Sequence, residues 1–254
     1  MADVVDYKIF GDDIQLVEVE LDPSEGVRAE AGTMTYMDNS IEMQTGTGGG
    51  LLKGLKRAVT GESFFITTFL NNGRDKAKVA FAAPYPGKII PLDLSQLGGT
   101  FLCQRDSFLC AAQGTEIEVA FTKRLGAGLF GGEGFILQRL EGDGLTFVHA
   151  GGTIIERTLA AGETLRVDTG CLVAFAPTVD YDIQMVSGFK NVLFGGEGLF
   201  LAKLTGPGLV YLQSLPLSRL AGRILAAARF QKTGESKGVA GLGGDILGNI
   251  ISGG

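Results

Sequence analysis

Three glutamates stand in the same local sequence, each directly after a glycine, and carboxylates placed in this way could hold a cation. They are Glu62, Glu133 and Glu197, in the stretches GESFF, GEGFI and GEGLF. If the three turns meet around one axis, their carboxylates supply the oxygen ligands that a hard cation prefers. The alternative is that each glutamate caps backbone N–H groups of its own turn, which is the commoner use of such a side chain. The sequence therefore offers both a metal site and a structural turn, and it favours the turn.

Basic residues precede each of these glutamates and could bind an anion. In the first segment, GLLKGLKRAV mixes leucines with the charges, a combination that suits contact with a membrane surface or another anion. A solvated loop is the ordinary alternative for a few surface lysines. The candidate ligand- or anion-binding residues are Lys53, Lys56, Arg57, Lys123, Arg124 and Lys190.

No catalytic motif accompanies these residues. GAGLFG (126–131) fits the G-x-G-x-x-G pattern, but it leads into the strand-like run FILQRL, whereas dinucleotide binding requires a helix at that point. His149 is the only histidine, so a site built from several imidazoles is excluded, and no Gly-x-Ser-x-Gly elbow supports a catalytic triad. We therefore expect His149 to be structural, and we expect neither an enzyme nor a cofactor.

The elements that carry these residues come in similar copies. The stretch GLFGGEGFILQRLEGDGLTFV begins at Gly128 and NVLFGGEGLFLAKLTGPGLVYL begins at Asn191, and their glutamates, at 133 and 197, are 64 residues apart. A more divergent copy lies upstream, in residues 30–44 and 61–73. Self-similarity of this kind is typical of repeat architectures. The sequence predicts three copies, at about residues 5–80, 81–150 and 151–215, in a pseudo-threefold arrangement.

Each copy reads as strands. TEIEVAF places Ile117, Val119 and Phe121 on one face and two glutamates on the other, which is the period-two pattern of a strand with one buried face. FILQRLEGDGLTFVHA and LFLAKLTGPGLVYLQ predict hairpins closed by glycine-rich turns. We expect an all-β fold of repeated β-sandwich or double-stranded β-helix-like modules. A short helix is predicted at 217–230, and a flexible glycine-rich tail at 231–254.

Composition narrows the classes of protein that remain. The chain has 254 residues, of which 45% are hydrophobic and 20% charged, so a sizeable core is possible. The net charge of −6 argues against nucleic-acid binding. No apolar run approaches the roughly 18 residues that span a bilayer, and no signal peptide is visible. Three cysteines without Cys-x-x-Cys spacing are expected to be reduced core residues of a cytoplasmic protein.

The combination of LRVDTGCLVAF, the twin LFGGEG elements and GGTIIERTLAAGETLRVD resembles the bacterial members of the altered-inheritance-of-mitochondria family number twenty-four. The resemblance covers about residues 5–230. It implies an all-β fold similar to that of the tryptophan RNA-binding attenuation protein, repeated within one chain. The family's mitochondrial member is associated with inner-membrane organisation, and the resemblance transfers no catalytic residue.

Two classes of function follow as expectations. The first is a non-enzymatic scaffold or interaction protein that meets a protein partner or a membrane surface through its repeated loops. We expect it to be cytoplasmic, with peripheral membrane contact as an option, and homo-oligomeric, because exposed strand edges invite pairing. The alternative is a small-ligand or RNA-binding module that uses grooves between the repeats.

Overall fold

The computed structural model describes residues 1–45, 66–123, 135–186, 199–225 and 227. The chain divides into two compact units, Met1–Pro216 and Leu217–Gly254. The first unit consists of strands and short 3-10 helices, and the second has a helix at residues 217–225, so the expected all-β fold with one short C-terminal helix is confirmed. The predicted tail, 231–254, lies outside the described residues. No helix in the described part of the chain is long and apolar enough to cross a membrane.

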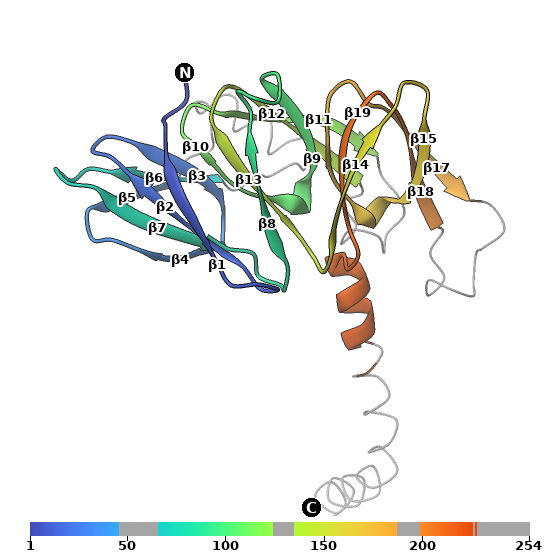
Figure 1. Ribbon diagram of the computed structural model, residues 1–254. Helices are drawn as coiled ribbons and strands as arrows, with labels where there is room; N and C mark the ends of the chain where they lie inside the picture. Colours follow the sequence, from blue (N-terminus) through green and yellow to red (C-terminus); the bar gives the residue numbers. More distant parts are fainter. Residues whose placement is uncertain (46–65, 124–134, 187–198, 226, 228–254) are drawn as a thin grey trace, which may run out of the picture. The chain divides into compact units, whose positions relative to one another are not determined.

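The described strands of the first unit form four antiparallel sheets, which we call A to D (Figure 1). Sheet A contains, in order, β1 (Asp6–Phe10), β2 (Leu16–Leu21), β7 (Ala77–Ala82) and β4 (Met34–Met37). Sheet B contains, in order, β5 (Ile41–Thr45), β6 (Ile66–Asn71), β3 (Gly26–Glu30), β10 (Phe108–Ala112), β13 (Leu145–Ala150) and β8 (Lys88–Asp93).

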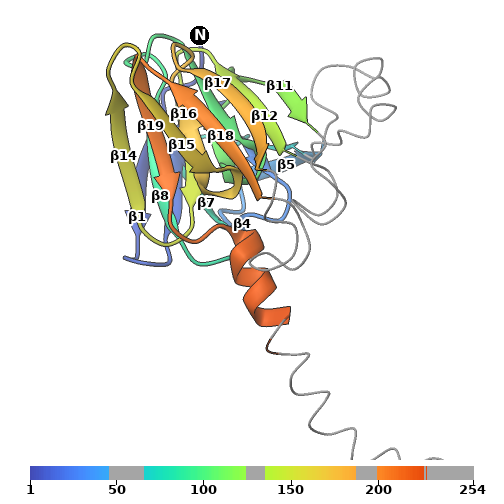
Figure 2. The same cartoon turned by 90° about the vertical axis from the view of Figure 1, so that its right-hand side faces the viewer.

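Sheets C and D are built in the same way and are seen from the side of sheet D in Figure 2. Sheet C contains, in order, β11 (Glu116–Lys123), β12 (Phe135–Glu141), β9 (Thr100–Gln104), β16 (Leu172–Phe175), β19 (Gly208–Gln213) and β14 (Ile154–Leu159). Sheet D contains, in order, β15 (Thr164–Asp168), β18 (Leu199–Thr205) and β17 (Asp180–Val186). Short 3-10 helices, Arg105–Ser107 and Thr169–Cys171, precede β10 and β16.

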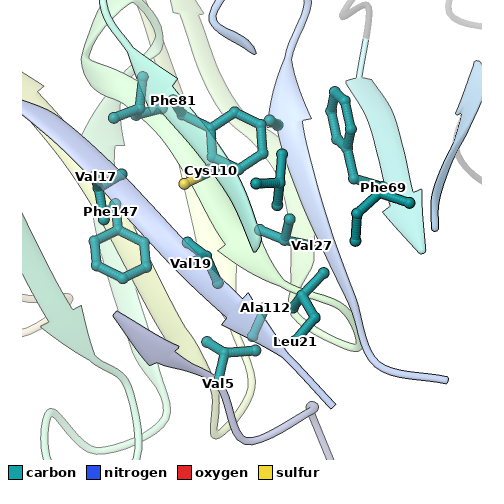
Figure 3. Packing of buried hydrophobic residues seen from close by; sticks show 14 of the residues in the cluster. Val5, Val17, Val19, Leu21, Val27, Phe69, Phe81, Cys110, Ala112 and Phe147 are labelled. Carbon is teal, nitrogen blue, oxygen red and sulfur yellow. The ribbon is translucent and has the colours of Figure 1, made fainter. Parts of the chain in front are cut away.

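Buried apolar side chains fill the space between each sheet and the next. Sheets A and B share the cluster of Figure 3, which includes Val17, Val19, Phe69, Phe81 and Phe147. Sheets B and C share a second cluster around Leu92, Phe101, Leu140 and Val148. Sheets C and D share a third around Phe135, Val167, Phe175 and Leu204. Sheets B and C are therefore covered on both faces, which explains why β10 and β16 are apolar throughout rather than alternating.

The order of strands follows a simple rule. At each place in sheet C the strand number is six higher than at the corresponding place in sheet B. The half-sheets β4-β7-β2 of sheet A and β17-β18-β15 of sheet D continue the same rule at the two ends. Strands β12 and β18 begin at residues 135 and 199, 64 residues apart, and the two 3-10 helices, at 105 and 169, have the same spacing. The predicted pseudo-threefold arrangement of copied modules stays a prediction.

The hairpins predicted across the glycine-rich turns are wrong. Strand β12 pairs with β11 and β9 in sheet C, whereas β13 pairs with β10 and β8 in sheet B. The turn between them therefore leads from one sheet to the next. Gly142 has φ +142°, and a Cβ on Gly144 would lie 2.6 Å from Cβ of Ala2. Glycine permits a tight connection between two sheets as readily as a hairpin turn within one sheet. The turn residues alone therefore cannot distinguish the two kinds of connection.

Candidate interaction site

Of the site residues predicted from the sequence, Lys123 alone lies within the described part of the chain. The last residue of β11 is Lys123, whose backbone pairs with Phe135 of β12. Within the described ranges, no group of three or more His, Cys, Asp or Glu residues could hold a metal. The three glutamates lie outside these ranges, so their predicted convergence stays a prediction. The other predicted site residues lie outside the described ranges. They are Lys53, Lys56, Arg57, Glu62, Arg124, Glu133, Lys190 and Glu197.

The segments that carry these residues connect three corresponding pairs of strands. The pairs are β5–β6, β11–β12 and β17–β18, and each is antiparallel. The two ends of each segment are close together, because Thr45 pairs with Thr67, Lys123 with Phe135, and Val186 with Leu199. These pairs take the same place in the strand order of sheets B, C and D.

Strand β4 is the most exposed strand that the structure describes. All four of its residues, Met34–Met37, are exposed, and three of them have large apolar or aromatic side chains. Tyr36 is 43% exposed, and Met34 and Met37 are each 36% exposed. By contrast, every residue of β10 and of β16 is buried.

Strand β4 nevertheless occupies the same position as β10 and β16. Each of the three is paired on one side with the corresponding strand, β7, β13 or β19. Each pairing has a register shift at its start, and equivalent residues can be matched from these shifts. The shifts lie between Met34 and Tyr36, between Phe108 and Cys110, and between Leu172 and Ala174.

The difference between these strands lies on their other side. Strand β10 also pairs with β3, and β16 also pairs with β9. No strand within the described residues pairs with the outer edge of β4. A free edge presents unpaired N–H and C=O groups, and charged residues or proline usually protect it from pairing. Every other edge strand described here carries a charged residue, whereas β4, with the sequence Met-Thr-Tyr-Met, has none.

Hydrogen bonds fix the position of β4 on sheet A. The Tyr36 hydroxyl donates to the Glu18 carboxylate, and the Lys78 ammonium donates to the same carboxylate at 2.9 Å. These bonds lower the pKa of Glu18, and the bond to Glu18 raises the pKa of Tyr36. Met37 pairs with Val79, which belongs to the core between sheets A and B. Met37 therefore lies on the same face of sheet A as Val79, because paired residues point to the same face, and it is exposed at the open edge.

A half-buried polar cluster lies where the first 3-10 helix meets sheet B, and sequence reasoning missed it. Burial and, to a smaller extent, the charge of Asp106 raise the pKa of Glu30 to about 7, and Arg105 opposes the shift. The Tyr85 hydroxyl donates to the backbone carbonyl of Asp106 at 3.2 Å, and burial raises its pKa. Arg105 and Asp106 form an ion pair at 3.2 Å. The cluster can exchange a proton near neutral pH at Glu30.

His149 lies in the core beside this cluster. It is 1% exposed, and its ring meets the edge of Tyr85 at a centroid distance of 4.6 Å. Burial lowers its pKa to about 4, so the imidazole is neutral at pH 7. In the corresponding place on β19, Gln213 accepts a hydrogen bond from Gly151 N and donates one to Gly170 O. His149 differs from Gln213, because its Nδ1 is buried without a hydrogen-bond partner among the described residues.

Stacked antiparallel sheets with one exposed, uncharged edge strand define the class of protein: an all-β protein built from layered sheets. The family model described as mitochondrial biogenesis AIM24 matches residues 7–215. The chain belongs to this family.

Two relatives from Streptococcus pyogenes are similar to the chain. An uncharacterised protein of serotype M6 is 32% identical over 217 residues, which cover 82% of this chain and 85% of the relative. A crystal structure of a protein from the same species has a TM-score of 0.71 and 28% sequence identity, and the match covers 88% of this chain and 99% of that one. Neither name describes a ligand or an activity.

Proposed function

We propose that the protein is a non-enzymatic interaction or scaffold protein that engages a partner through the free edge of β4. The observation that carries this proposal is the contrast between β4, which is exposed throughout, and β10 and β16, which hold the same place and are buried. An extended strand of a partner can add to such an edge through backbone hydrogen bonds, and side-chain contacts then provide specificity. In this proposal the protein works in the cytoplasm.

A photo-crosslinking experiment tests the proposal. A photoreactive residue replaces Thr35 in the middle of β4, and in a matched variant it replaces Glu156, which is exposed on the charged edge strand β14. Irradiation of living cells should give a defined adduct from position 35 and none from position 156. Equal labelling at the two positions, or no adduct at position 35, would remove the proposal. Mass spectrometry of the adduct identifies the partner.

Peripheral contact with an anionic membrane surface is a second role, favoured by the equivalent placement of the three strand pairs that flank the basic segments. Basic residues near an anionic surface contribute about 1 kcal/mol each, so reversing three charges removes about 3 kcal/mol of attraction, adds repulsion, and should weaken binding by more than about a hundredfold. Co-sedimentation of the full chain with phosphatidylserine-containing vesicles measures this effect. The variant is Lys53→Glu, Lys56→Glu and Arg57→Glu together, and phosphatidylcholine vesicles are the control. An unchanged bound fraction would contradict this role.

A further inference from the structure

Each six-stranded sheet consists of two three-stranded halves joined at one seam. In sheet B the halves β5-β6-β3 and β10-β13-β8 meet where β3 pairs with β10. In sheet C the halves β11-β12-β9 and β16-β19-β14 meet where β9 pairs with β16. The same kind of seam therefore occurs twice within one chain.

Among the strands that the structure describes, sheets A and D each contain only one of the two halves. Sheet A has the half β4-β7-β2, with β1 added on its far side, and lacks the half that would pair with β4. Sheet D has the half β17-β18-β15 and lacks the half that would pair with β15. The half that sheet A lacks corresponds to β17-β18-β15 of sheet D, and the half that sheet D lacks corresponds to β4-β7-β2 of sheet A. In Figure 1, β4 belongs to the first sheet of the series and β15 to the last.

Exposure marks β15 as the second unfilled half of a seam. Strands β3 and β9, which are paired on both sides, each have at most two residues that are not buried. Strand β15 has one buried residue, Val167, and its other residues are exposed or half-buried. Both members of the missing seam, β4 and β15, are thus more exposed than the strands that correspond to them.

The charges on β15 are compatible with an interior position. Arg166 lies two residues before the end of β15, as Arg28 does in β3. Asp168 is the last residue of β15, as Glu30 is of β3. In sheet B, Arg28 is paired with Ala111 inside the seam, and its guanidinium donates to the Thr115 carbonyl at 3.0 Å. An arginine at this register is therefore accommodated within a completed sheet.

We infer that a second copy of this chain fills the edge of β4 with its own β15, so that sheet D of one chain and sheet A of the next form one continuous sheet. This inference rests on the proposed function and names its partner. The two seams within the chain set the register, because Cys110 pairs with Ala29 and Ala174 with Cys103. The equivalent pairs between chains are Tyr36 with Val167 and Met37 with Arg166. Such a contact is head-to-tail, so it closes into a ring or continues as a filament.

Disulfide trapping tests this register. Chains with Met37→Cys are mixed with chains with Arg166→Cys under mild oxidation, and Cys171, which is half-buried, is replaced by serine in all chains. Directly paired strand residues have Cα atoms about 4.5–5.5 Å apart, within the disulfide range. The mixture should give a two-chain product. In the control, Thr164→Cys replaces Arg166→Cys; this residue lies about 7 Å farther along the strand, and its yield should fall at least fivefold.

Sedimentation of the full chain provides an independent measurement. The native chain should sediment well above its monomer mass of 26.6 kDa, with a mass that falls on dilution. Thr35→Lys, which places a charge on the open edge, should shift the chain to monomer, whereas Thr158→Lys on edge strand β14 should not. Circular dichroism spectra should be the same for all three chains.

The outcomes separate this inference from the proposed function. A native chain that is monomeric at 100 µM, an assembly that Thr35→Lys leaves intact, or a disulfide between two Met37→Cys chains would each overturn the head-to-tail seam. If the photo-crosslinked adduct at position 35 is a different protein, the seam is refuted and the proposed function stands. If position 35 gives no adduct, both fail.

Discussion

Half-buried Glu30 and buried His149 respond to pH in opposite directions. Glu30 has its pKa raised by burial to about 7, so its ionised form is disfavoured in the folded chain. His149 has its pKa lowered by burial to about 4, so its protonated form is disfavoured. Both are linked to Tyr85, since the Tyr85 ring contacts His149 and the charge of Glu30 raises the pKa of Tyr85. Stability is therefore penalised by alkali at one residue and by acid at the other.

Replacing Glu30 by glutamine should remove the alkaline penalty. Glu30 is protonated in both states below its ordinary pKa of 4.5, and stability is lost as pH rises through about 7, because only the unfolded chain ionises it freely. The difference corresponds to at most roughly 3 kcal/mol. Urea unfolding at pH 4.5 and pH 8 should show a smaller loss of stability for Glu30→Gln than for the native chain. Glu116→Gln, on an exposed position of β11, is the control, and parallel pH profiles for Glu30→Gln and the native chain would contradict the prediction.

His149 offers a direct measurement because it is the only histidine of the chain. We expect its imidazole NMR signals to remain those of the neutral ring from pH 8 down to about 5 and to shift only near pH 4. Its contribution to stability is lost as pH falls from the ordinary value of 6.5 through about 4. An imidazole that titrates near pH 6.5 in the folded chain would show that it is not buried as described.

The connections between sheets depend on glycines at close contacts. Gly87 begins the approach to β8, and a Cβ there would lie 2.3 Å from the Ala150 carbonyl oxygen and 2.5 Å from the His149 ring. In the corresponding place before β14, a Cβ on Gly151 would lie 2.1 Å from the Leu215 carbonyl oxygen. Backbone atoms on the opposite side cannot rotate away, so the chain itself must shift to admit a side chain.

Gly87→Ala should therefore destabilise the protein by about 1–3 kcal/mol, as for an overpacked core. Gly222→Ala is the control, because a Cβ at Gly222 meets nothing within 4 Å and its φ is not positive. Gly222 lies in the helix at 217–225, so this change should be neutral or stabilising by up to about 1 kcal/mol. Urea unfolding of both variants measures the difference. Equal losses would mean that the contact at Gly87 is relieved without cost.

The positions of strands can be predicted from the sequence more readily than which strands pair with each other. The alternation in TEIEVAF correctly indicated β11, and the helix at 217–225 falls within its predicted range. The connection after β12 was misread, because glycines in a turn look the same whether the next strand joins the same sheet or the neighbouring one. Pairing is a long-range property, which local sequence does not record.

Local sequence is equally limited in predicting the candidate site, which depends on long-range neighbours. The stretch Met-Thr-Tyr-Met was recognised as part of a strand-rich segment, but its exposure results from a missing neighbour rather than from its own residues. Glu30 could not be singled out from the sequence, because its raised pKa depends on its burial in the fold and then on the charge of Asp106, which comes from a distant part of the chain. The basic and acidic candidate residues, apart from Lys123, lie in segments outside the described residues. The structure describes only the strands on either side of these segments.

At the scale of the whole molecule, the first unit should fold without the second. Residues 1–216 form one compact unit in which sheets B and C are each shared by strands from distant parts of the sequence. A chain that ends at Pro216 should keep its β-rich circular dichroism spectrum and unfold in one transition, with a melting temperature within a few degrees of the full chain. A large loss of melting temperature would show that the second unit supports the first.

The seams also bear on how such a protein changes in length. Because each junction uses the same pair of strand positions, six more strands added after β19 would find a waiting edge at β15 and leave an identical edge on their other side. Nothing in the existing pairings would need to be rewritten. The number of layers is thus a free variable of this architecture, and a tandem duplication could lengthen the protein in a single step.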